Sequence, residues 1–273
     1  MAVIHQVRGM AMIKPTLAMT LLLAFSLNAT ADFNAGVAAY EAEDYKQAFK
    51  EFSDVALQED ARAQGLIAGM YASGLGVTKD VGQAVRWYHK AAEGGDAQSQ
   101  FVLGVMYANG HGVPKDDLQA LKWYQMSAGQ GYADAQYNLG VIYARGRAVP
   151  QDDAEAVKWY LKAAEQGIAE AQYNLGSRYA EGRGVPRDDA EAVYWYQNAA
   201  EQGLAAAQNN LGSMYASGRG VPKDDVQAVQ WYRKAAEQGI AAAQINLGNM
   251  YADGRGVPKD EVQALSWYRK AAE

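Results

Sequence analysis

The chain has 273 residues, of which 49% are hydrophobic and 21% charged, with a formal net charge of −6 and no cysteine. This composition excludes an intrinsically disordered chain, which would be poorer in apolar residues. The acidic balance without a basic run argues against nucleic acid as a partner, and the lack of cysteine excludes a disulfide framework.

The first residues are typical of a cleavable export signal. Arg8 and Lys14 precede the apolar run Leu17–Leu27, and Ala29–Ala31 supplies the small-x-small pattern of a cleavage site. Eleven apolar residues are too few to span a bilayer, and no second run could act as a membrane stop. We therefore expect a signal peptide at residues 1–31 and no membrane span.

Cleavage near Ala31 would leave a mature chain with 23 basic and 31 acidic residues, a net charge of −8. The segment that begins at Met12 is a complete signal by itself, so either Met1 or Met12 is the start. The expected location is the periplasm, or outside the cell after secretion.

A 36-residue repeat organises the rest of the chain. Five of the six prolines keep this interval, and so do six tyrosines from Tyr71 to Tyr251. The six tryptophans, which are all the tryptophans in the chain, keep it too: Trp87, Trp123, Trp159, Trp195, Trp231 and Trp267. Such regularity indicates an array of structural repeats.

Each repeat is predicted to contain two helices. In the unit Ala205–Gly239, the first segment places Ala207, Leu211 and Tyr215 on one face. The second segment, from Asp224 onwards, has its own apolar face at helical spacing. Because neither helix could bury its face alone, the hairpins must stack into a solenoid.

The stretch GRGVPKDD (residues 218–225) could be a phosphate cradle, a metal loop or a turn. It recurs with small changes in all six units, whereas a ligand loop would be needed once. Gly218 can adopt the left-handed backbone conformation that often ends a helix, and Pro222 cannot continue the first helix. Asp224 then caps the second helix, with Gln227 as its capping-box partner. The stretch is predicted to be a turn.

The unit Ala169–Gly203 combines recurring spacings of alanine, Leu-Gly, G-x-G-V-P and Trp-Tyr. In this combination it resembles the Sel1-like repeat, a relative of the tetratricopeptide repeat. Six such units cover residues 61–273. Residues 32–60 resemble a plain tetratricopeptide hairpin with a turn at Glu43–Asp44, and we expect them to form an N-terminal cap. The resemblance implies an all-α fold, a right-handed superhelix of antiparallel helix pairs, and a protein-interaction scaffold. Exported bacterial members are implicated in envelope assembly, signalling or contact with host cells.

Similarity to tetratricopeptide helices also suggests that residues beside Leu-Gly face a concave groove. An asparagine there could grip the backbone of a bound peptide, because an amide offers both a donor and an acceptor. Alternatively, each asparagine bonds a neighbouring helix and sets the repeat spacing. The predicted partner-binding residues of this kind are Tyr137, Asn138, Tyr173, Asn174, Asn210 and Asn246.

Two arginines depart from the repeat. Arg178 stands where other units have methionine or isoleucine, and Arg145 stands where others have asparagine, glutamate or aspartate. We expect them to form a basic spot suited to a carboxylate of the partner. The alternative is that Arg178 extends its charge to solvent or pairs with Glu181.

An enzyme is not expected, nor a cofactor or metal. His89 and His111 occupy positions that vary between units, and no H-E-x-x-H motif occurs. Weak β-lactamase activity, which is described for cysteine-rich Sel1-like proteins, would lack both disulfides and an S-x-x-K serine here.

A peptidoglycan or other glycan is the alternative partner to a protein, peptide or host-cell surface protein, because groove tyrosines such as Tyr137 and Tyr173 could stack on sugars. The tryptophans are expected to pack between helices and not to bind sugars. The last helix resembles interior ones and lacks the polar face of a cap, so the chain is either a monomer or weakly self-associated end to end.

Overall fold

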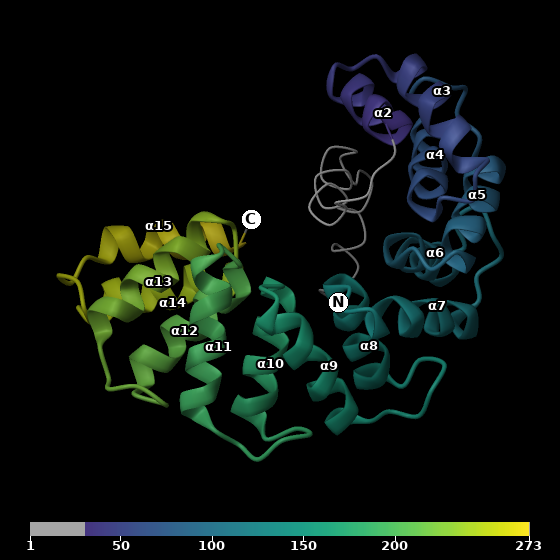
Figure 1. Cartoon of the computed structure of the whole chain (residues 1–273). Helices are drawn as coiled ribbons and strands as arrows, with labels where there is room; N and C mark the ends of the chain where they lie inside the picture. The colour runs from purple at the N-terminus through teal and green to yellow at the C-terminus, as the bar shows by residue number, and fades with distance from the viewer. Residues whose placement is uncertain (1–30, 273) are drawn as a thin grey trace. The chain divides into compact units, whose positions relative to one another are not determined.

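The computed structural model describes residues 31–272, and this part of the chain is entirely helical, with no strand (Figure 1). The all-α fold predicted from the sequence is confirmed. All of the predicted signal peptide except Ala31 lies outside the described residues. Its cleavage and the export of the chain stay predictions.

The helices fall into two compact units, which meet in the sequence between Tyr132 and Ala133. Each helix packs against the next one along its unit, so that hairpins stack in chain order. The first unit contains α2 (Ala31–Glu41), α3 (Tyr45–Ala56), α4 (Ala61–Ser73), α5 (Val81–Glu93), α6 (Ala97–Asn109) and α7 (Asp117–Gly129). The second contains α8 (Ala133–Arg145), α9 (Asp153–Glu165), α10 (Ala169–Glu181), α11 (Asp189–Glu201), α12 (Ala205–Ser217), α13 (Asp225–Glu237), α14 (Ala241–Asp253) and α15 (Glu261–Ala272).

The predicted turn between the two helices of a repeat is confirmed. Gly218 has φ +71°, and its N–H donates to the carbonyl of Met214 at the end of α12. The Asp224 carboxylate accepts the backbone N–H groups of Val226 (2.9 Å) and Gln227 (3.0 Å) at the start of α13. These bonds satisfy groups that helix ends otherwise leave unpaired.

The Leu-Gly pair explains how the two helices of a repeat approach so closely. Leu211 is fully buried, and a Cβ added to Gly212 would lie 2.7 Å from the Tyr232 ring of α13. The glycine therefore forms the hollow into which the tyrosine of the W-Y pair packs. The same hollow recurs at Gly140, Gly176 and Gly248.

Each first helix from α4 to α14 carries a buried glutamine, and Gln208 shows how such a residue joins three helices, a role not predicted from the sequence. The Gln208 side chain donates to the carbonyl of Ala200 at the end of α11 (3.1 Å). It also accepts from Gln238, which follows α13 (2.8 Å). Because the Gln208 amide is buried and both its nitrogen and its oxygen are hydrogen-bonded, it fixes the distance between one hairpin and the next.

The turn also forms a contact between consecutive repeats of the second unit. Arg219 donates to the Asp189 carboxylate of the preceding repeat (Nη2 to Oδ1, 2.6 Å), and Arg255 does the same to Asp225 (2.6 Å). Beside each arginine, the second glycine lies against the backbone of that aspartate. A Cβ on Gly220 would overlap the carbonyl oxygen of Asp189. The recurring stretch is thus a turn, as predicted, and also an inter-repeat clamp.

This clamp predicts sensitivity to acid. Hydrogen bonds from Arg219 and Arg187 lower the pKa of Asp189 from 3.8 to about 2. A lowered folded-state pKa means that the charged pair stabilises the native state above about pH 4, and that this stabilisation is lost as the pH falls toward 2. We expect urea midpoints of the wild type to fall between pH 6 and pH 2.5 by more than those of Arg187→Gln/Arg219→Gln. Equal falls in both proteins would contradict the clamp.

Ala148 interrupts the glycine pattern. It has φ +62°, in the region that favours glycine, and it stands where Gly184, Gly220 and Gly256 occur in later repeats. A left-handed conformation costs a non-glycine residue about 1–2 kcal/mol. Greater freedom of a glycine in the unfolded chain offsets about 0.4–1 kcal/mol of that cost.

We therefore expect Ala148→Gly to raise the free energy of unfolding by about 0.5–1 kcal/mol, measured by urea denaturation. Ala154→Gly, at an exposed position of α9, should lower it because glycine weakens helices. A loss of stability in both variants would show that the Ala148 backbone is unstrained.

Candidate interaction surface on the first helices of the second unit

All eight residues predicted to bind a partner lie in the second unit, on or at the end of its first helices. Those helices are α8, α10, α12 and α14, and the Leu-Gly pair of each points into the core. Leu139, Leu175, Leu211 and Leu247 are fully buried. The residues before each Leu-Gly pair are half-buried or exposed, and we call them the first-helix face: Tyr137, Asn138, Tyr173, Asn174, Asn209, Asn210, Ile245 and Asn246.

The asparagines of this face connect neighbouring repeats. Asn174 forms a side-chain hydrogen bond with the Tyr137 hydroxyl, one repeat earlier. Asn246 donates from Nδ2 to the Asn209 Oδ1 (3.0 Å), again across one repeat boundary. Asn210 bonds the Tyr196 hydroxyl of the preceding repeat. These contacts support the spacing role.

Asn138 differs, because its Nδ2 donates to the Asp134 carbonyl within its own helix (3.0 Å). A side-chain amide offers two donor and two acceptor positions, and the bonds described for these asparagines use only part of that capacity. A peptide-binding role stays a prediction, alongside the structural role that the contacts show.

Two tyrosines give the face its aromatic surface. Tyr137 packs on Tyr160 with ring centroids 6.1 Å apart, and Tyr173 packs on Tyr196 at 5.9 Å. Burial, followed by the Glu170 charge, raises the pKa of Tyr137. Its hydroxyl therefore stays protonated at neutral pH and can donate as well as accept.

A pair of carboxylates lies close to Tyr137, and it was not predicted from the sequence. Asp134 and Glu170 occupy the same position in the first turns of α8 and α10, 36 residues apart. Burial raises the pKa of Asp134, and repulsion from Glu170 raises it further. Two carboxylates that repel one another gain from a cation between them. Aligning the repeats would have revealed the pair, since other units have Arg62, Gln98 or alanine there.

Arg178 is held inside the unit by an ion pair. Its Nη1 donates to the Asp153 carboxylate of α9 (2.6 Å), and its side chain is 11% exposed. The partner is Asp153 and not Glu181, which corrects the alternative drawn from the sequence. Glu181 lies 3.6 Å from Arg183 instead. The Arg178 charge is thus largely neutralised within the protein.

A second contact explains why an arginine stands at this position. Arg178 hydrogen-bonds the Tyr160 hydroxyl. In the next two hairpins the equivalent tyrosines bond Ser177 and Ser213. The residue equivalent to these serines in the Tyr160 hairpin is Val141, which has no polar group. Arg178 thereby supplies the missing bond.

Arg145 lies exposed in the last turn of α8. The carboxylate-binding spot expected of Arg145 and Arg178 stays a prediction, and it would depend mainly on Arg145.

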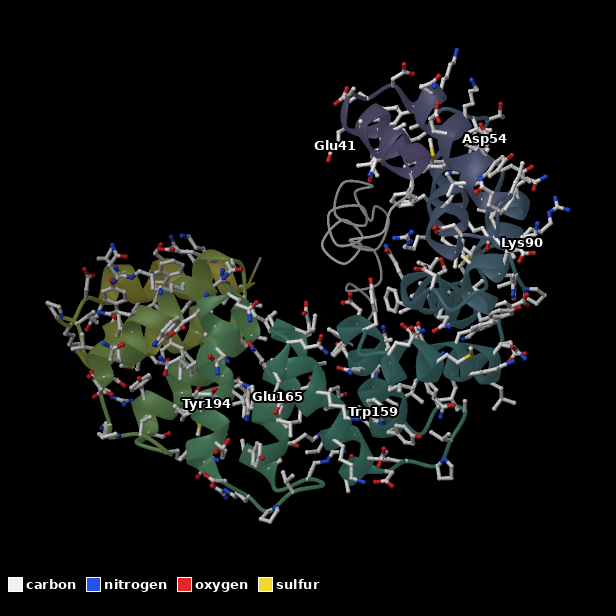
Figure 2. All side chains as sticks on the ribbon, viewed as in Figure 1. Glu41, Asp54, Lys90, Trp159, Glu165 and Tyr194 are labelled. Atoms are coloured by element: carbon white, nitrogen blue, oxygen red, sulfur yellow. The ribbon has the colours of Figure 1, made fainter. Side chains whose placement is uncertain are left out.

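The tryptophans pack between helices, as predicted. Trp123 and Trp195 are buried, and the others are half-buried. A lysine ammonium covers the ring in most repeats, as at Trp159, where Lys162 Nζ lies 4.2 Å from the ring centroid. Figure 2 shows Trp159 on α9 and Tyr194 on α11. In the Tyr194 repeat, Asn198 replaces the lysine, and Tyr194 packs edge-on against Trp195 (4.9 Å). A ring face covered by lysine is closed to a sugar.

His89 is not the simple surface residue expected from the sequence. It is half-buried, hydrogen-bonds the Tyr107 hydroxyl (3.2 Å) and packs edge-on against Trp123. His111 is exposed. Across residues 31–272, no three histidine or carboxylate side chains come together in a way that could hold a metal ion. Among the helices from Ala31 onwards, none combines the length and apolar character needed to cross a membrane.

Comparison with known proteins agrees with the repeat pattern. The family model described as the Sel1 repeat matches residues 61–96, 97–132, 133–168, 169–204, 205–240 and 241–273. The chain belongs to the Sel1 repeat family. Sel1 repeat proteins typically mediate protein–protein interaction, and the family is generally non-catalytic. The helical pair α2 and α3 precedes the matched range, and its role as a cap stays a prediction.

Solved structures of similar proteins share the fold. A Sel1 repeat protein from Oxalobacter formigenes is 34% identical over 90% of this chain and 98% of its own, with a TM-score of 0.76. A protective antigen present in uropathogenic Escherichia coli strains, which displays an SLR fold, is 42% identical with a TM-score of 0.77. That match covers 82% of this chain, but this Sel1 repeat protein spans only 48% of the antigen. No protein with a curated description matches it significantly.

Proposed function

We propose that this Sel1 repeat protein is an exported, non-catalytic scaffold that binds an extended segment of a protein partner along the first-helix face. The family supports a protein partner, and the signal-like first 31 residues support export. The observation that carries the proposal is a half-buried asparagine repeated at one position of α8, α10, α12 and α14, preceded by a tyrosine in α8 and α10. Evenly spaced donors and acceptors suit the evenly spaced peptide groups of an extended chain.

The carboxylate pair would make this surface prefer a partner segment with a basic residue. The Glu170 charge acts on both Asp134 and Tyr137, so a lysine or arginine of the partner beside Glu170 would also lie near the aromatic ring. The net charge of −8 expected for the mature chain would also attract a basic segment. We therefore propose a partner segment that carries at least one basic residue.

The setting we propose is the cell envelope or the surface of a host cell. The similar Escherichia coli protein is a protective antigen, which supports a location that host components can reach. Envelope assembly and host contact both fit this location, and the partner's identity would distinguish them.

The test is affinity capture with residues 32–273, applied separately to envelope extract and to host-cell lysate. Glu170→Lys changes an acid that borders the first-helix face, and Glu165→Lys makes the same charge change at an exposed position of α9. We expect a protein that the wild type and Glu165→Lys retain and that Glu170→Lys loses by at least about tenfold, because a like charge then faces the basic residue.

Equal retention by both variants would move the binding site away from this face. Retention of purified peptidoglycan, with no protein retained from either extract, would favour a glycan partner and overturn the proposal. Circular dichroism of each variant checks that its helical content is unchanged.

A further inference from the structure

A glutamine that follows the second helix of later repeats is missing from the first repeat. In four later repeats this residue donates to the buried glutamine of the first helix: Gln130 to Gln100, Gln166 to Gln136, Gln202 to Gln172 and Gln238 to Gln208. In the first repeat the same position, after α5, is Gly94, which has no side chain. The buried glutamine there, Gln64, therefore lacks the glutamine partner that its equivalents have.

The side-chain oxygen of Gln64 is left without a donor. Gln64 is 6% exposed, and its Nε2 donates to the Ala56 carbonyl at the end of α3 (3.2 Å). Among residues 31–272, no group donates to its Oε1. A nearly buried acceptor without a donor is unfavourable, so this oxygen gains from any N–H group that reaches it.

A pocket of about 410 Å³ lies at this place in the first unit, and Gln64 and Gly94 both line it. This volume falls within the range of about 300–1,000 Å³ that is typical of pockets for small ligands. Its lining includes the half-buried Trp87 and the apolar Leu57, which is 75% exposed. The pocket thus surrounds a polar acceptor with apolar side chains.

The charges at the pocket favour a cation. Glu59 and Glu93 line it, and Lys90, whose Nζ lies 4.4 Å from the centroid of the Trp87 ring, lines it too (Figure 2). Two acids and one base give these three side chains a net charge of −1. A carboxylate would be repelled by the acids and would offer no donor to Gln64 Oε1. The pocket is therefore suited to a cationic group that carries N–H donors.

We propose that this pocket binds an arginine side chain of a protein partner, which takes the place of the missing glutamine. In the second repeat, Gln130 Nε2 donates to both the Gln100 Oε1 (2.8 Å) and the Gly95 carbonyl (2.9 Å). The equivalent oxygens of the first repeat are Gln64 Oε1 and the carbonyl of Glu59. Glu59 has φ +65°, a left-handed conformation like that of Gly95 at +96°. A guanidinium presents several N–H donors in one plane, so it can bond both oxygens and also face the acids.

Nuclear magnetic resonance of residues 32–273 tests this site with N-acetyl-arginine amide as the probe. We expect a saturable shift of the Trp87 indole N–H signal, with a dissociation constant of about 1–10 mM for a single side chain. The Trp231 indole is the internal control and should not shift, because Lys234 covers its ring in the same way (4.1 Å) and Gln238 is present there. N-acetyl-lysine amide has the same charge but lacks the planar fork, so it should bind at least about threefold more weakly. Equal shifts of both tryptophans, equal binding of both probes, or no shift overturns the proposal.

Gly94→Gln supplies the missing side chain, so it should abolish the response of Trp87 to the arginine probe. The new Cβ would lie 2.9 Å from the Ala61 Cβ, but the same pair of glutamine and alanine occurs in four later repeats. The backbone also suits glutamine, since Gly94 has φ −72° and Gln202 has φ −76°. Gly129→Gln is the matched control and should keep the response, because a Cβ there would meet nothing within 4 Å. A response that survives in Gly94→Gln overturns the proposal.

Charge reversal at the pocket gives a second test that does not depend on packing. Glu93→Lys should weaken binding of the arginine probe by about fivefold or more, because a like charge then faces the guanidinium. Glu237→Lys makes the same change at the equivalent position of α13 and should leave binding unchanged. Both glutamates are exposed, so both variants should fold normally. Binding by Glu93→Lys that equals binding by the wild type overturns the proposal.

Discussion

Gly220→Ala is expected to lower the free energy of unfolding of the second unit by about 2–5 kcal/mol. About 1–2 kcal/mol comes from placing a side chain at φ +69°. A further 1–3 kcal/mol, roughly, comes from overpacking, since the new Cβ would overlap the Asp189 carbonyl oxygen. That carbonyl belongs to the backbone of α11 and cannot move aside without separating the two repeats. Urea denaturation followed by circular dichroism measures the loss.

Gly203→Ala provides the matched control. Gly203 also has a positive φ, +94°, but a Cβ there would meet nothing within 4 Å. The free energy of unfolding of this control should therefore fall only by the cost of a left-handed backbone conformation in alanine, about 1–2 kcal/mol. The difference between the two variants isolates the close approach of one repeat to the next. Equal losses would mean that the second glycine of the turn is needed for its backbone conformation alone.

Gly212→Ala is expected to destabilise the hairpin of α12 and α13, although alanine favours helices more than glycine does. The new Cβ would lie 2.7 Å from the Tyr232 ring, so the helices must separate or the ring must leave its hollow. Overpacking of this kind costs about 1–3 kcal/mol, and the gain in helix propensity of up to about 1 kcal/mol offsets part of it. We expect a net loss in urea denaturation, with weaker near-ultraviolet circular dichroism from the displaced aromatic ring.

Gly129→Ala should instead raise the free energy of unfolding. Gly129 ends α7, and a Cβ there would have no neighbour within 4 Å. The variant should gain up to about 1 kcal/mol from reduced freedom of the unfolded chain. A stabilised Gly212→Ala would show that the hairpin can open slightly without cost, and that the Leu-Gly pair does not set the helix separation.

Regular features of the chain could be predicted from its sequence because local rules determine them. The turn at Gly218 needs a residue that adopts a left-handed backbone conformation, a proline that ends the first helix and an aspartate that caps the second. The sequence contains all three. The hairpins follow from apolar periodicity, and the stacking of hairpins follows from faces that one hairpin cannot bury.

Irregular side chains were harder to place, because their partners are set by the contact between repeats. Arg178 was expected to be available to a ligand or to pair with Glu181, but it reaches Asp153 and Tyr160 in the preceding hairpin. The arginine and second glycine of the stretch were predicted only as parts of a turn, yet they also bind the previous repeat at Asp189. Neither contact could be predicted without knowing which residues stacking brings together.

By itself, the sequence determined the repeat, the two helices of each unit and the turn that joins them, since residues within about four positions of each other control these features. Tertiary structure decided which polar groups remain available. Stacking places Asn174 against Tyr137, and Asn246 against Asn209, so their amides join repeats before they meet any partner. It also covers Val229 but leaves Leu265 exposed at an equivalent position. Burial depends on neighbouring hairpins, so residues at equivalent positions differ in exposure along the array.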